Sequence, residues 1–176
     1  MKKIIALFFT ILIPFLSVSQ EKTDDDLVGI IEELSNYSDV IDGTEIEYFT
    51  NVDLNKKTGR IKITDTHDYS AKYVETVISF NLEDIDLRSV KYQLTKNDDN
   101  DYYVIMFEIS TLNNSVEYSE VIFKNGKEYT RVSETNSSDL IRLSANGKAM
   151  PKDLARKYIN SWMKLLGITM AEEIKN

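Results

Sequence analysis

The feature that most constrains this chain is an amphipathic helix predicted for residues 151–166. At 100° per residue, its apolar side chains fall on one arc of about 140°. Pro151 suits the first helical position, and Gly167 suits the left-handed residue that follows a last turn. So wide an apolar face needs a large surface to pack against, and residues 44–144, which read as short strands, can supply one. The apolar side chains are Leu154, Ala155, Tyr158, Ile159, Trp162, Leu165 and Leu166.

The opposite side of this predicted helix is polar and mostly basic. In a chain with a formal net charge of -8, a basic stripe on one helix could bind an acidic partner or a second copy of the chain. Arg156 is therefore a candidate binding residue. A helix face in contact with water explains the same charges and is the commoner arrangement. The polar side consists of Lys152, Asp153, Arg156, Lys157, Asn160, Ser161 and Lys164.

From residue 44 onward, apolar residues recur at every second position, which indicates strands. The segment 102–109 is apolar on nearly both faces, so it is predicted to be a central strand. Asn125 and Gly126 predict a tight hairpin, and the short turns between successive strands predict antiparallel pairing. Strands are predicted at residues 45–49, 60–63, 73–80, 90–94, 102–109, 116–123, 127–133 and 140–143.

A first helix is predicted for residues 24–37, where an acidic triplet at 24–26 can cap the free amides of the first turn. Together these patterns predict an α+β fold. An N-terminal helix is followed by an antiparallel strand meander that forms a sheet or partly open barrel, and the C-terminal amphipathic helix closes it. Residues 20–176 are predicted to form a single globular domain.

Residues 1–19 are predicted to be a Sec-type signal peptide. Lys2 and Lys3 form its charged start, residues 4–16 are an apolar run too short to span a bilayer, and residues 17–19 are small enough for cleavage before Gln20. No cysteine follows the apolar run, so the signal is not that of a lipoprotein. We therefore expect a periplasmic or secreted protein with no transmembrane segment in the mature chain.

The composition excludes several classes of function. The sequence pI near 4.8 argues against nucleic acid and against broad adhesion to anionic lipid, because both need a net basic surface. The chain has no cysteine, which excludes disulfides, thiol catalysis and thiolate metal sites. His67 is the only histidine, and we interpret it as a solvated loop residue. No catalytic residue, metal ligand or cofactor is predicted.

The remaining candidate binding residues lie in the predicted strands. Glu108 interrupts the apolar segment 102–109, and a buried carboxyl group there would have a raised pKa and could bind a polar ligand. Alternatively, it faces water or pairs with Arg131 or Lys127. Tyrosines could line a groove for sugars, peptides or apolar ligands, although tyrosine is also simply a good strand residue. The candidates are Tyr92, Tyr103, Tyr118 and Tyr129.

The segment 80–86 (FNLEDID), the start of the mature chain at Gln20 and the closing helix together resemble a group of small exported proteins from Bacteroidota. That resemblance implies a compact β-barrel closed by a C-terminal helix, similar to the pleckstrin-homology-like superfold. It implies no catalytic residue. Such barrels bind peptides, lipids and proteins alike, so the resemblance does not choose among ligands.

We therefore predict a non-enzymatic, exported binding or interaction module for a protein or peptide of the cell envelope. One alternative is a hydrolase or lyase that uses Glu108, Tyr103 and His67. Another is a small-molecule carrier, which would need an interior cavity of at least about 300 Å³. We expect Trp162 and its neighbours to fill that space instead.

Overall fold

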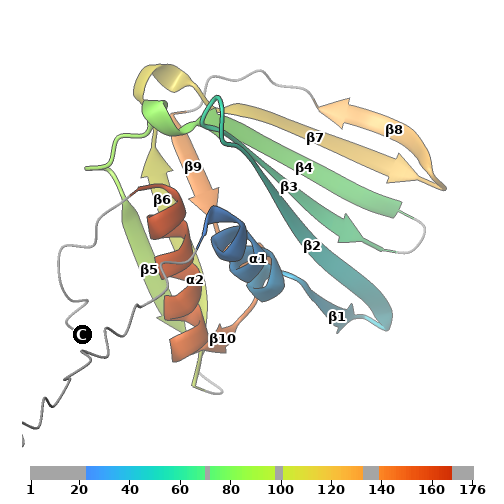
Figure 1. The fold of residues 1–176 in the computed structure, drawn as a ribbon. Coiled ribbons are helices and arrows are strands. Elements are labelled where there is room, and N and C mark those ends of the chain that lie inside the picture. The colour runs from blue at the N-terminus through green and yellow to red at the C-terminus, as the bar shows by residue number, and fades with distance from the viewer. Residues whose placement is uncertain (1–22, 70–71, 98–100, 133–138, 168–176) are drawn as a thin grey trace, which may run out of the picture.

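A computed structural model describes residues 23–69, 72–97, 101–132 and 139–167 of the chain (Figure 1). In these ranges the protein is α+β, with two α-helices and antiparallel strands arranged in two sheets, and no closed barrel. The predicted signal peptide lies outside the described residues. Among the residues described, no helix has the length and apolar character needed to cross a membrane.

The larger sheet has six strands in the order β1-β2-β3-β4-β7-β8, and every neighbouring pair is antiparallel. Asn125 and Gly126 both have positive φ at the turn between β7 and β8, as the predicted hairpin requires. The strands are β1 (Tyr37–Ile41), β2 (Thr44–Asn55), β3 (Arg60–Asp68), β4 (Lys72–Asn81), β7 (Glu117–Lys124) and β8 (Lys127–Val132).

The smaller sheet is built around β6 (Tyr102–Ser110), which pairs with three other strands and is central, as predicted. One edge of β6 pairs with β5 (Lys91–Lys96). Its other edge pairs with β9 (Leu140–Leu143) and with β10 (Met150–Pro151). The chain therefore leaves the larger sheet after β4, forms the β5–β6 hairpin, and returns to pair β7 with β4.

Helix α1 (Asp24–Ser35) begins with a capping box. The Thr23 hydroxyl accepts a hydrogen bond from the Asp26 amide, and the Asp26 carboxylate accepts one from the Thr23 amide at 2.9 Å. Helix α1 ends at Ser35, two residues before the predicted end, because Asn36 is extended and Tyr37 already belongs to β1. The sequence patterns did not reveal β1 or the two-residue strand β10.

One cluster of buried apolar side chains connects both helices and both sheets. Helix α2 (Lys152–Leu165) packs against α1 and β6, and α1 packs against β2, so the helices lie side by side next to the smaller sheet (Figure 1). Trp162 is 1% exposed and meets Tyr158 edge to face, with 6.4 Å between ring centroids. The prediction that the apolar face of this helix is buried is confirmed.

Several strands of the larger sheet extend past both helices (Figure 1). Strand β3 is longer than predicted, since it continues from Arg60 to Asp68. His67 therefore lies in a strand, half-buried, and the interpretation of His67 as a solvated loop residue is wrong. It pairs with Tyr48 of β2 and Val74 of β4.

Candidate functional site

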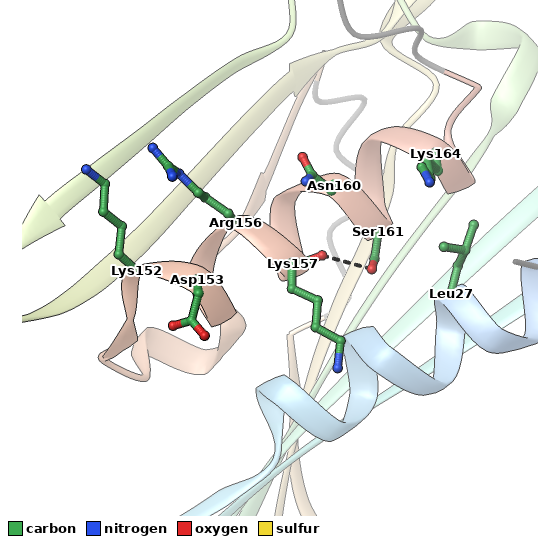
Figure 2. A pocket seen from close by; sticks show the side chains of 8 residues that line it. All are labelled: Leu27, Lys152, Asp153, Arg156, Lys157, Asn160, Ser161 and Lys164. Carbon is green, nitrogen blue, oxygen red and sulfur yellow. Dashed lines mark hydrogen bonds between the residues drawn. The ribbon is translucent and has the colours of Figure 1, made fainter. Parts of the chain in front are cut away.

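An open groove of about 660 Å³ follows the polar side of α2 (Figure 2). Leu27 of α1 forms part of its wall, because α1 and α2 pack against each other. All other described lining residues come from α2, and four of them are basic. These residues are Lys152, Asp153, Arg156, Lys157, Asn160, Ser161 and Lys164.

The side chains leave α2 in two directions (Figure 2). Lys152, Arg156 and Asn160 project to one side of the helix, as their spacing of four residues requires. Asp153 and Lys157 project to the other side, toward α1. The one acidic residue of the groove is therefore separated from the row that contains Arg156.

The cations of this groove are not neutralised within the described part of the chain. Ion pairs form there between other residues, and none of them includes a residue of α2. The Lys152 ammonium group lies 5.9 Å from the ring centroid of Tyr103 on β6, which is a cation–π contact and leaves the charge uncompensated. In a chain of net charge -8, this groove is a local concentration of positive charge.

Two polar atoms at the groove also lack partners. Arg156 Nε and Asn160 Oδ1 are buried atoms with no hydrogen-bond partner. Arg156, Lys157 and Asn160 are half-buried, so the expectation of a fully solvated helix face is only partly correct. Ser161 is buried, and its hydroxyl donates to the Lys157 carbonyl at 2.9 Å. Unpartnered buried polar atoms are uncommon and often mark the place of a missing water, ion or ligand.

The four predicted tyrosines do not form one surface. Tyr92 and Tyr103 lie in the smaller sheet, on β5 and β6, whereas Tyr118 and Tyr129 lie in the larger sheet, on β7 and β8. Tyr129 is 65% exposed, and the Lys124 ammonium group lies 4.0 Å from its ring centroid. Of the four, only Tyr103 lies next to the α2 groove, through its contact with Lys152.

Glu108 lies in a second, smaller groove of about 430 Å³ on the smaller sheet, which Tyr92 also lines. Arg142 Nε of β9 donates to Glu108 Oε1 at 2.8 Å, and the Glu108 side chain is 29% exposed. Its ion-pair partner is therefore Arg142 and not Arg131, which pairs with Glu128.

The residues of the hydrolase alternative do not come together. Glu108 and Tyr103 are separated by five positions on β6, so their side chains point to opposite faces of the smaller sheet. His67 belongs to the larger sheet. Trp162 of α2 belongs to the buried core cluster, as expected if side chains fill the space that a carrier cavity would need.

A row of polar side chains that the sequence patterns missed crosses the inner face of the larger sheet. Thr50, Asp65, Thr76 and Glu120 occupy matching positions on β2, β3, β4 and β7. The Thr50 hydroxyl donates to Asp65 Oδ1 at 2.7 Å. Burial raises the pKa of the Asp65 carboxyl group, and the hydrogen bond from Thr50 opposes that rise. No motif could reveal this row, because it depends on the register of four strands.

Hydrogen bonds within the fold already use several groups near this row. Asn146 Nδ2 donates to Thr50 Oγ1 at 2.8 Å and to the Ser35 carbonyl at 3.2 Å. The Tyr37 hydroxyl donates to the Asn146 carbonyl at 2.9 Å, and burial raises the pKa of Tyr37 to about 12. The Tyr37 ring stacks on Tyr48 at 4.4 Å between centroids. These contacts tie α1, β1 and β2 to the turn before α2, so we assign this network a structural role.

Within the described ranges, no group of three or more histidine or acidic side chains is placed to hold a metal ion. The α2 groove remains the candidate site, because four basic side chains line it and none forms an ion pair among the described residues. Comparisons of the chain with known protein families, with curated proteins and with solved structures found no match.

Proposed function

We propose that this protein is a non-enzymatic, exported binding module that holds an anionic ligand in the groove along α2. The observation that carries the proposal is the set of four basic side chains on one groove, without an ion pair among the described residues, in an acidic protein. Cations held close together repel one another, so an arrangement of this kind is favourable when an anion binds between them.

Export is part of the proposal and is supported by the charged start, apolar run and small residues of positions 1–19. A pleckstrin-homology-like architecture is also proposed, supported by an antiparallel meander and by the packing of α2 on β6. The function does not depend on that architecture, because such folds bind many classes of ligand.

The first experiment measures binding of long polyglutamate to the purified protein by calorimetry at low ionic strength, with polylysine as the opposite-charge probe. We expect polyglutamate to bind in the groove and polylysine to bind only to the acidic surface outside it. Binding should weaken steeply as salt is raised from about 0.01 to 0.15 M, because exposed charges are screened beyond about 8 Å at the higher concentration.

Lys164→Glu tests whether the groove is responsible, because Lys164 is exposed and lines it. The matched control is Lys57→Glu, which makes the same charge change at an exposed position in the turn between β2 and β3. We expect Lys164→Glu to weaken binding about fivefold or more and Lys57→Glu to change it less than twofold. Equal effects of both substitutions would mean that only the overall charge matters, and would remove the groove from the proposal.

A further inference from the structure

The row on α2 that contains Arg156 has a spacing that selects among anionic ligands. Lys152, Arg156, Asn160 and Lys164 follow one another at intervals of four residues and all line the groove. An α-helix rises 1.5 Å and turns about 100° per residue, so successive members are about 6 Å apart along the axis and about 40° apart around it. The whole row is a slanted ridge that spans about 18 Å along the axis. A phosphate, a sulfate or a single carboxylate reaches one or two neighbouring cations and leaves the rest unpaired.

An extended polypeptide has nearly the same repeat. Its side chains alternate between two sides, so every second residue points the same way, at intervals of about 6.6–6.8 Å. A strand of six to seven residues therefore covers the row. Acidic side chains at alternate positions can meet Lys152, Arg156 and Lys164 one after another.

The middle of the row suits the main chain of such a ligand. Arg156 Nε is a donor and Asn160 Oδ1 is an acceptor, and neither has a hydrogen-bond partner. A peptide backbone offers both a carbonyl and an amide, whereas a polyphosphate or an acidic lipid headgroup at neutral pH is mainly an acceptor. Both atoms are buried, so the side chains have to rotate to reach a ligand.

We propose that the α2 groove binds an extended acidic segment of a partner polypeptide, with acidic residues at alternate positions. This inference rests on the proposed function and adds the class of ligand to it. The net charge of -8 disfavours nucleic acid and anionic membrane as ligands, because both present phosphate over a wider area than the groove. A single bound segment touches only the groove and avoids that repulsion.

The test compares two seven-residue peptides of identical composition by calorimetry. One has glutamate at the four odd positions and serine between them, and the other has its four glutamates grouped at one end. We expect the alternating peptide to bind about fivefold or more tightly, because an extended chain then presents all its carboxylates to the row. Inorganic phosphate and vesicles containing phosphatidylglycerol are measured in parallel and are expected to bind more weakly than either peptide.

Substitutions at the two ends of the row distinguish a ligand that is extended along the row from one that is compact. Lys152→Gln and Lys164→Gln should each weaken binding of the alternating peptide about threefold or more, and Lys57→Gln, which does not line the groove, should not. An effect at only one end, or phosphate binding as tight as the alternating peptide, would overturn the extended segment and leave the proposed anion site intact. Tighter binding of vesicles would replace the polypeptide with a membrane ligand. Absence of binding by every probe would overturn both proposals.

Discussion

Replacement of Trp162 with alanine tests the packing on which the fold depends. Trp162 is 1% exposed and lies in the cluster that joins both helices to both sheets. A buried aromatic side chain hides about 150–250 Å², which at about 25 cal/mol/Å² corresponds to about 4–6 kcal/mol. A compact unfolded chain already shields part of this surface from water, which reduces the gain on folding. We therefore expect Trp162→Ala to lower the free energy of unfolding by about 3–5 kcal/mol.

The assay is urea denaturation followed by far-UV circular dichroism, because the variant has no tryptophan to report by fluorescence. Trp162→Phe is a milder substitution at the same position. It keeps an aromatic ring and leaves a smaller cavity than alanine does, so its expected cost is about 1–2 kcal/mol. Tyr129→Ala is the control at an exposed aromatic residue and should cost less than about 1 kcal/mol. A loss below about 1 kcal/mol for Trp162→Ala would refute the reasoning.

Three further substitutions test separate parts of the fold. Burial raises the pKa of Asp65, so the native state keeps this proton to a higher pH than the unfolded chain and its contribution to stability falls as pH rises. Asp65→Asn should therefore be more stable than the wild type at pH 7, and urea titrations should show the difference shrinking toward about pH 3. Thr23→Ala removes the capping box of α1 and should cost about 0.5–2 kcal/mol in the same titration; no change would mean that this end of α1 is frayed. Asn146→Ala loses two hydrogen bonds at a position with φ of 55°, and we expect a cost of about 2–3 kcal/mol by thermal and urea unfolding. The exposed Asn51→Ala loses one 3.3 Å hydrogen bond to Glu32 Oε1 and should cost about 0.5–1 kcal/mol.

The parts of the fold that could be predicted are those that local sequence determines. The apolar arc of α2 repeats with the helical period, and the Asn125–Gly126 turn has residues that tolerate positive φ. Strand β1 escaped prediction because it starts right after α1 and all but its first residue are exposed, so it has no alternating burial. The pairing of β4 with β7 also escaped, because local periodicity does not reveal which distant strand a strand will meet.

In the candidate site, too, the features fixed by local sequence could be predicted and those that depend on distant contacts could not. Arg156 and its basic neighbours could be found from charge and helical spacing alone. Their partial burial could not, because it depends on how α1 packs against α2 and places Leu27 at the groove. Similarly, the position of Glu108 in an apolar segment was visible, but its ion pair with Arg142 depends on the register between β6 and β9.

The long connection between β4 and β7 has a consequence for folding. Strand β4 ends at Asn81 and its neighbour β7 begins at Glu117, and about 35 residues, including β5 and β6, separate them. Closing a loop of that length costs about 3 kcal/mol of chain entropy. During folding, the edge of β4 therefore stays unpaired until β7 pairs with it, and an unpaired strand edge is where a partly folded chain aggregates. A holding chaperone would therefore protect this protein most before β4 and β7 have paired.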